Sequence, residues 1–254
     1  MAAALPPVQG DLRGQKVVVI GGSAGIGHAS AARAYAAGAD LALAARGAER
    51  LEKAAKDLMA AGGRPVAYEV VDMRDRAMVA SYLGRQAPFD HLLLPGAGVY
   101  RTTYADLDEE KARLSVDAKF WGQFWSAYDA RAHMPRGGSI TFYSGVANRR
   151  PVPGYVIGAV IDGALDGCTR ALAYEFAAEK IRVNTISPGV VASSFVDRIT
   201  PEVKKELFDG YARKVPVGRV GESDDCAQAA MYLMTTSFVT GQVLRVDGGA
   251  ESVP

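Results

Sequence analysis

Short apolar runs alternate with longer helical patterns along almost the whole chain, and this alternation constrains the fold most. Seven runs are expected to be strands: residues 17–20, 41–45, 66–71, 91–94, 139–144, 182–187 and 243–246. Helices are expected near residues 26–37, 48–61, 75–86, 107–133, 155–179, 195–213 and 223–235. The runs are apolar nearly throughout, which is typical of parallel strands covered on both faces. Right-handed crossovers then predict an α/β fold, a doubly wound parallel sheet of the Rossmann type, with about seven strands and helices on both faces.

The chain is expected to form a single domain over residues 1–254. It has no internal repeat, no low-complexity linker and no break in composition, and 49% hydrophobic with 22% charged residues suits one large core. Residues 1–13 contain several Pro and Ala residues without periodicity, and we expect them to form a loose arm.

Charge and cysteine content argue against several classes of partner. A net charge of +1 without a long run of one sign indicates neither nucleic acid nor an anionic membrane as partner. No apolar run could span a bilayer, and the N-terminus lacks the pattern of a secretory signal. Cys168 and Cys226 form no CxxC pair and suit a reducing, cytoplasmic location. The three histidines show no metal-ligand spacing, so we expect no metal site.

A glycine-rich segment follows the first predicted strand and begins the first predicted helix. Gly21, Gly25 and Gly27 stand where the chain must turn tightly, approach a pyrophosphate and pack helix against strand. The helix N-terminus offers N–H groups and a positive dipole end to phosphate. This context predicts a dinucleotide site.

The chain resembles the single-domain form of the short-chain dehydrogenase/reductase family over residues 14–249. The resemblance rests on the glycine loop 21–27, Asp72, the segment 95–98, the segment 182–193 and the triplet 247–249. Two departures are Ile20, where the family has Thr, and Pro95-Gly96, where it has Asn-Asn. The resemblance implies cofactor contacts from Gly21, Ser23, Ala24, Gly25, Ile26, Gly27, Arg46, Asp72, Met73, Gly96, Ala97, Gly98, Pro188, Gly189, Val191 and Ser193.

The end of the second strand indicates which nucleotide is used. An acidic residue there would bind the ribose 2′-hydroxyl, whereas a nearby Arg favours a 2′-phosphate. This chain has Ala45 at that position and Arg46 directly after it. A guanidinium matches phosphate geometry, so we expect NADP(H) as cofactor, the alternative being that Arg46 is an ordinary surface residue.

The residues that carry proton transfer in the resembled family are replaced here. Its Ser, Tyr and Lys positions correspond to Gly145, Gly158 and Asp162, and its Asn position corresponds to Asp117. Ser144 is one residue early, and a one-residue step along a strand turns the side chain to the other face. Tyr155 lies three residues before the Tyr position and is either a substrate contact or a packing residue at a helix start.

Asp162, Asp117, Tyr155 and Ser144 are therefore the candidate catalytic residues. If the family geometry holds, Asp162 faces the nicotinamide ribose and the substrate. It can stabilise a cation such as an iminium ion, or it can hydrogen-bond the ribose in the place of the Lys. Asp166, one turn further on, is expected to be a solvated or interface carboxylate.

These replacements favour an NADPH-dependent reductase of a C=N bond or another preactivated small molecule, because an iminium ion needs hydride alone. Two alternatives stay open. One is a cyclase or isomerase that uses the NADP-bound pocket as a template, as in fungal alkaloid-pathway family members that combine iminium reduction with a Diels–Alder cyclisation. The other is an inactive NADP-binding sensor or partner subunit.

An aromatic stripe within the fourth predicted helix is either core or a subunit interface. It consists of Phe120, Trp121, Phe124, Trp125 and Tyr128. The resemblance implies a homodimer or homotetramer.

Overall fold

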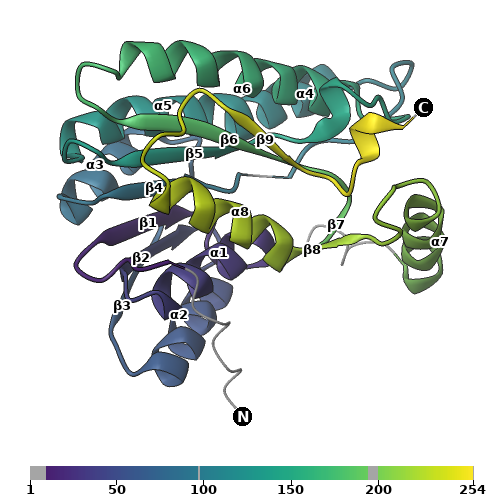
Figure 1. Ribbon diagram of the computed structural model, residues 1–254. Coiled ribbons are helices and arrows are strands. Elements are labelled where there is room, and N and C mark those ends of the chain that lie inside the picture. The colour runs from purple at the N-terminus through teal and green to yellow at the C-terminus, as the bar shows by residue number, and fades with distance from the viewer. Residues whose placement is uncertain (1–9, 97, 194–199, 254) are drawn as a thin grey trace.

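A seven-stranded parallel sheet forms the centre of the molecule. The computed structural model describes residues 10–96, 98–193 and 200–253 (Figure 1). In chain order the strands are β1 (Lys16–Ile20), β2 (Asp40–Ala45), β3 (Val66–Val70), β4 (His91–Leu94), β5 (Ser139–Tyr143), β6 (Arg182–Pro188) and β9 (Val243–Val246). Their order in the sheet is β3-β2-β1-β4-β5-β6-β9, and every pairing is parallel. The predicted doubly wound α/β fold is confirmed.

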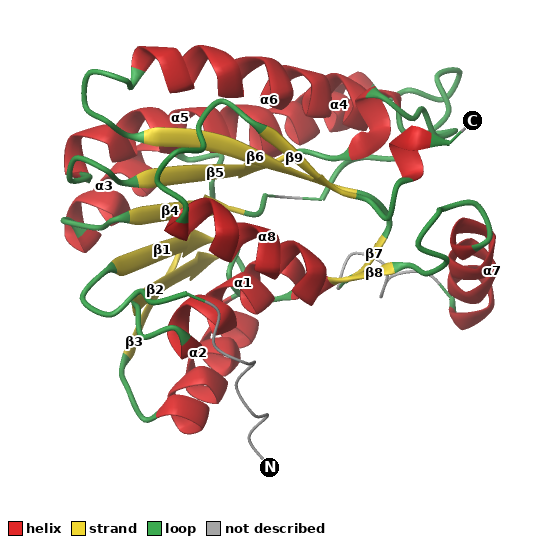
Figure 2. Ribbon diagram, in the orientation of Figure 1, coloured by secondary structure: helices red, strands yellow, loops and turns green. Residues whose placement is uncertain are grey.

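Helices cover both faces of the sheet (Figure 2). They are α1 (Gly25–Ala36), α2 (Ala48–Gly62), α3 (Arg76–Gln86), α4 (Glu109–Val116), α5 (Gly122–Ala130), α6 (Val156–Glu175), α7 (Pro201–Ala212) and α8 (Ser223–Thr235). One hydrophobic core lies between the sheet and α1, α2 and α8, and a second lies between the sheet and α3, α5 and α6. All residues of β4 and β5 are buried, including the polar His91, Ser139 and Thr141, as expected of parallel strands covered on both faces.

The topology places a crevice at the carboxyl ends of the strands. Val18 of β1 pairs with Ala42 of β2 on one side and with Leu92 of β4 on the other. After β1 the chain continues to β2 on one side, and after β4 it continues to β5 on the other side. The strand order therefore reverses between β1 and β4, and ligands of open α/β sheets bind at such a reversal. A small two-stranded sheet, β7 (Val191–Ala192) with β8 (Gly221–Glu222), and helix α7 lie beyond that edge (Figure 1).

The helix expected over residues 107–133 is interrupted by one wide turn. Helix α4 leads into a π-helical turn, Asp117–Trp121, which continues as α5 and ends in a 3₁₀ turn, Arg131–His133. Asp108 caps the start by accepting a hydrogen bond from the N–H of Lys111. π turns inside α-helices occur often at functional sites.

The loose arm expected over residues 1–13 can be compared with the structure only from residue 10 onward. Residues 1–9 lie outside the described residues. Leu12 is fully buried against the first core, and its N–H donates to the carbonyl of Ala37. Burial of the Leu12 side chain stabilises this segment on the core. The expectation of a loose arm is therefore wrong for residues 10–13.

The aromatic stripe is partly buried in the core and partly exposed on the surface. Phe120 and Phe124 pack against the second core, whereas Trp121 and Tyr128 are exposed to 41% and 45%. The guanidinium of Arg76 stacks on Trp125 at 4.1 Å from the ring centroid.

Candidate active site

A cavity of about 1250 Å³ opens at the carboxyl ends of the strands. Fifteen of the sixteen expected cofactor residues line it: Gly21, Ser23, Ala24, Gly25, Ile26, Gly27, Arg46, Asp72, Met73, Gly96, Gly98, Pro188, Gly189, Val191 and Ser193. The sixteenth, Ala97, lies outside the described residues. Another part of the wall consists of Leu207 and Tyr211 of α7 and of Lys214, which follows this helix.

The glycine loop forms a cradle that no side chain could enter. Gly21 and Gly25 have φ angles of +108° and +56°, which favour glycine. A Cβ on Gly27 would lie 2.2 Å from the carbonyl oxygen of Gly21. Helix α1 begins directly after Ala24, with no side-chain cap and no acidic residue in its first turn. Its N–H groups can therefore donate hydrogen bonds to a pyrophosphate, and its dipole favours the negative charge. The loop fits a dinucleotide.

Two arginines lie near the end of β2, the position from which the nucleotide preference was predicted. Arg46 and Arg50 both line the cavity beside the end of β2. Asp72 lies nearby, and its carboxylate pairs with Arg74 at 2.5 Å. The hydrogen bonds from Arg74 lower the pKa of Asp72. Asp72 is therefore a fixed anion on this side, while the two arginines supply positive charge.

A buried ion pair lies at the floor of the cavity. The Nζ of Lys119 lies 2.9 Å from Oδ1 of Asp162 and donates a second hydrogen bond to the carbonyl of Ser144 at 3.1 Å. Lys119 comes from the π turn and Asp162 from α6, so the pair joins two elements across the cavity floor. Only 9% of the Lys119 side chain and 1% of the Asp162 side chain are exposed.

The environment of Asp162 acts on its pKa in both directions. Burial raises the pKa of this carboxyl group above its usual range, and Lys119 acts against that rise. The charge of Asp166 adds to the rise. The backbone N–H of Ala147 also lowers the pKa, but Oδ2 of Asp162 is buried and makes no hydrogen bond of good geometry among the described residues. An unpaired carboxylate oxygen at this depth is costly unless a ligand donates to it.

The two glycines on the cavity floor make room for neighbouring side chains. A Cβ on Gly145 would lie 2.6 Å from Oδ2 of Asp162. A Cβ on Gly158 would lie 2.1 Å from Cε1 of Tyr155. The Tyr155 ring therefore occupies the space into which a side chain at position 158 would project. Arg101 covers this ring at 5.2 Å from its centroid.

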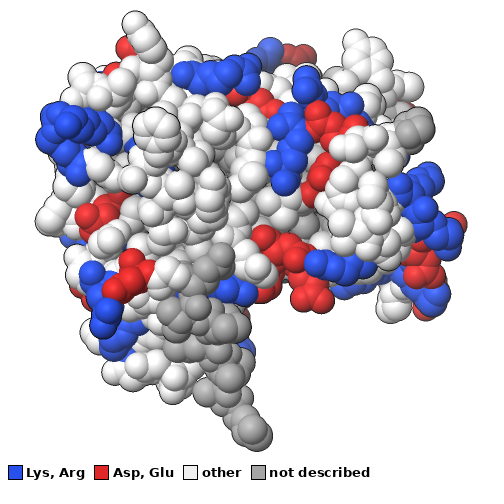
Figure 3. All heavy atoms as spheres, in the orientation of Figure 1, with Lys and Arg blue, Asp and Glu red and all other residues white. Residues whose placement is uncertain are grey.

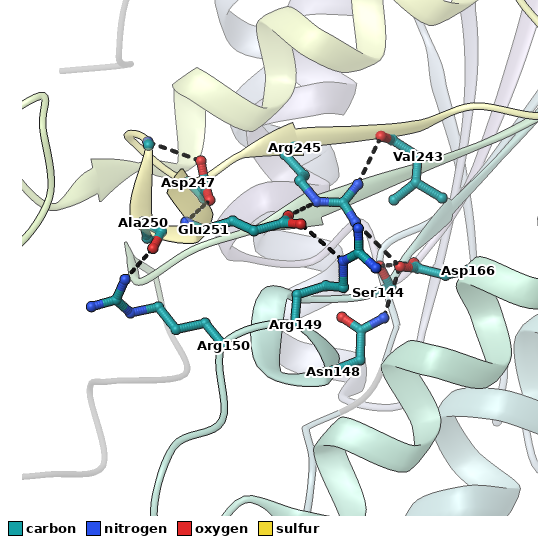
Figure 4. A network of polar contacts seen from close by, with 11 residues as sticks. Ser144, Asn148, Arg149, Arg150, Asp166, Val243, Arg245, Asp247, Ala250 and Glu251 are labelled. Carbon is teal, nitrogen blue, oxygen red and sulfur yellow. Dashed lines mark hydrogen bonds and ion pairs between the residues drawn. The ribbon is translucent and has the colours of Figure 1, made fainter. Parts of the chain in front are cut away.

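Ser144 is turned away from Asp162 toward the next turn of α6. Its hydroxyl donates to Oδ1 of Asp166 at 2.8 Å, and Asn148 donates to Oδ2 of the same carboxylate at 2.9 Å. Figure 4 shows both side chains directed at Asp166. Asp166 is therefore buried and hydrogen-bonded within this chain, which corrects the expectation of a solvated carboxylate. Ser144 lines the cavity, but its hydroxyl is engaged by Asp166 and not by Asp162.

A polar network ties the C-terminal segment to this region (Figure 4). Glu251 accepts a hydrogen bond from Nε of Arg149 at 2.9 Å and pairs with Arg245. Nη2 of Arg245 lies 4.0 Å from Oδ2 of Asp166. Charged residues of both signs alternate over the face shown in Figure 3, without a large field of one sign.

Asp117 is not brought to the main cavity. It lines a separate hollow of about 720 Å³, together with Trp121 and Trp125. The structure thus separates Asp117 from Asp162, the other candidate catalytic aspartate. Among the described residues, no three His, Cys, Asp or Glu side chains are grouped as metal ligands, and no helix has the length and apolar character to cross a membrane.

Comparison with known proteins identifies the family of this chain. A family model described as enoyl-(acyl carrier protein) reductase matches residues 21–251. The short-chain dehydrogenase/reductase ATR9 of Stachybotrys chlorohalonatus is 31% identical over 252 residues, which cover 94% of this chain and 98% of that protein. The chain belongs to the short-chain dehydrogenase/reductase family. This family consists of reductases and dehydrogenases.

Two solved structures are similar to this short-chain dehydrogenase/reductase over nearly its full length. A small-chain dehydrogenase in complex with NADPH is 30% identical, with a TM-score of 0.77, covering 94% of this chain and 99% of the other. The MalC reductase/Diels-Alderase from Malbranchea aurantiaca is 26% identical, with a TM-score of 0.88, covering 94% and 97%.

Lys119 is the site residue of this short-chain dehydrogenase/reductase that sequence reasoning missed. It is the one cation within the apolar segment 118–122, and a lysine in such a segment is a candidate for a buried pair. The π turn hides its direction, because a regular 3.6-residue period does not apply there.

Proposed function

We propose that this chain is an NADPH-dependent reductase of a small molecule with a C=N bond or a similarly preactivated double bond. The observation that carries the proposal is the cavity floor, which presents the Lys119–Asp162 ion pair where the family resemblance expects hydroxyl groups. Glycine at 145 and 158 leaves no side-chain hydroxyl at either position. In the resembled family such hydroxyl groups hold the ketone oxygen and protonate its developing alkoxide. Here the developing alkoxide would lie beside the Asp162 carboxylate, and two negative charges repel each other.

The ion pair suits a nitrogen-containing substrate. Oδ2 of Asp162 accepts no hydrogen bond from a described side chain, and the N–H of an iminium ion or amine is a donor that carries the matching charge. A carboxylate in a water-poor site stabilises developing positive charge more than it would in water. Asp162 therefore supports a cationic intermediate on the C=N carbon and nitrogen.

NADPH is the proposed cofactor because the loop fits a dinucleotide and Arg46 and Arg50 lie beside its adenosine end. When bound, NADPH supplies the hydride that reduces the acceptor carbon. The similar structure that holds NADPH supports this choice. We further propose that the protein acts as a homodimer or homotetramer.

The test uses NADPH deuterated stereospecifically at the transferable position, with panels of imines and of matched ketones. The proposal expects deuterium in the amine products and little or none in alcohols. Brisk, deuterium-transferring reduction of simple ketones, with no transfer to any C=N compound, contradicts it.

A second candidate is a cyclase that uses the cofactor-filled cavity as a template. Its support is the similarity to the MalC reductase/Diels-Alderase together with the size of the cavity, about 1250 Å³. Orientation of a bound substrate alone can lower a barrier by several kcal/mol, roughly 7–11 in favourable cases. Formation of a cyclised product without deuterium and without net NADPH oxidation would favour this candidate.

A further inference from the structure

Lys119 is the member of the buried ion pair that reaches the cavity. Its side chain is 9% exposed, against 1% for Asp162, and both residues line the cavity. An ammonium group has three donors, and the two printed contacts, to Asp162 and to the carbonyl of Ser144, use two of them. Among the described residues no third acceptor is present, so one N–H remains for a ligand.

Contacts hold Lys119 in place at its backbone and at its ammonium group. Gln123 donates to its carbonyl at 2.9 Å and to the carbonyl of Tyr143 at 3.2 Å, which fixes the π turn against β5. The stem passes Gly96, where an added Cβ would lie 3.6 Å from Cγ of Lys119. The ammonium group is therefore preorganised rather than mobile, as proton transfer in an active site requires.

The pair can release a proton without a change in the net charge of the floor. Lys119 and Asp162 together carry no net charge. When a proton moves from Nζ to a neutral imine nitrogen, the N–H bond of Lys119 breaks and a new N–H bond forms on the substrate. The resulting iminium ion replaces the ammonium as the partner of Asp162.

We infer that Lys119 is the catalytic acid of this reductase and that the substrate enters as a neutral imine. This inference rests on the proposed reduction of a C=N bond. Hydride addition to the carbon then turns the π electrons into the nitrogen lone pair, and Lys119 takes a new proton from solvent. The sum is imine plus NADPH plus one proton, giving amine plus NADP⁺. Asp162 is the positioning residue: it holds the ammonium group of Lys119 in place, and its negative charge then stabilises the iminium ion.

The experiment compares a dihydroisoquinoline imine with its N-methyl iminium salt, at a pH where the imine is neutral in solution. Lys119→Arg keeps the positive charge but gives up no proton, because a guanidinium stays charged. We expect this variant to lose ~10²–10⁴-fold in turnover of the imine, the range of general acid catalysis, and to reduce the iminium salt within about threefold of the wild-type rate. The exposed Lys111→Arg on α4 serves as the matched control and should leave both rates unchanged.

A second measurement requires no turnover. With NADP⁺ in place of NADPH, the bound imine should show the absorption change of its protonated form in the wild type and not in Lys119→Arg. If Lys119→Arg does not fold, Lys119→Met combined with Asp162→Asn removes both charges at nearly constant volume and should show the same loss on the imine.

Three results separate the possible failures. Reduction of the imine at the wild-type rate by Lys119→Arg, or by the folded double variant, overturns the role of Lys119. Reduction of the iminium salt alone by the wild type also overturns it, while the proposed function stands. Reduction of neither compound by a wild type that binds NADPH removes both.

Discussion

The carboxylate of Asp162 packs directly on the α-carbon of Gly145, so that a single added methyl group at position 145 would lie 2.6 Å from Oδ2. The φ angle of Gly145 is 177°, an extended conformation that any residue adopts. The glycine is therefore required by the neighbouring carboxylate and not by the backbone. The same carboxylate is held by Lys119, so one glycine controls the geometry of the ion pair.

Gly145→Ser places the family's residue at this position and should not create a carbonyl reductase. The new side chain displaces the Asp162 carboxylate, and overpacking of this kind typically costs about 1–3 kcal/mol of the free energy of unfolding. Urea unfolding and turnover of the imine should both decline. Gly167→Ala in α6 is the control, because an added Cβ there meets nothing within 4 Å and replaces a helical glycine.

Removal of one partner of the buried pair should be worse than removal of both. Lys119→Met leaves the Asp162 charge buried without a counter-ion, which costs about 3–5 kcal/mol. Adding Asp162→Asn removes that charge and should restore most of the free energy of unfolding. Equal unfolding midpoints for the single and double variants would show that the two groups do not interact energetically.

The nucleotide preference should depend on Arg46. NADPH should bind at least tenfold more tightly than NADH, a difference of ~1.4 kcal/mol, and Arg46→Ala should abolish most of it. Calorimetric titration of both nucleotides measures the difference. Arg113→Ala, on an exposed ion pair of α4, provides the control for loss of an arginine. Equal affinities of the wild type for the two nucleotides would rule out the assignment.

Buried histidines should make the protein less stable in acid. Burial lowers the pKa of His91 to about 4, and the charge of Arg182 acts in the same direction. The unfolded chain binds a proton near pH 6.5, whereas the folded chain resists it until about pH 4. This contribution is complete above about pH 6.5 and declines by on the order of 3 kcal/mol as the pH falls to 4.

The measurement for this prediction is the free energy of unfolding from pH 7 to pH 4. His91→Gln should flatten its slope, since an amide can bond to Ser139 and Gln15 without titrating. Burial also lowers the pKa of His28, so a smaller slope should remain. An unchanged slope in His91→Gln would exclude His91 as the source.

The sheet could be predicted from the sequence because its central strands are covered on both faces and therefore contain mostly apolar residues. The cradle of Gly21, Gly25 and Gly27 could be predicted because close backbone approach admits no other residue. These features depend on local chemistry alone. Fifteen of the sixteen cofactor residues that the family resemblance implied also lie along one cavity.

The cavity floor could not be predicted in the same way. Lys119 reaches Asp162 only because a π turn changes the direction of the helix, and nothing in the spacing of apolar residues indicates that turn. The same turn directs Asp117 to a different hollow. The burial of Asp166 depends on Ser144, Asn148 and the C-terminal segment, which meet only in the folded chain.

The ring of Tyr155 over Gly158 has a consequence for the evolution of this site. A side chain cannot return to position 158 while the ring remains, because its first carbon would lie 2.1 Å from Cε1. Replacement of Tyr155 alone would leave a hole in the cavity wall. A lineage that has reached this arrangement can therefore regain a tyrosine at position 158 only through an intermediate that is overpacked or hollow. Homologues with glycine at this position should accordingly keep an aromatic residue three positions earlier, and the two positions should change together.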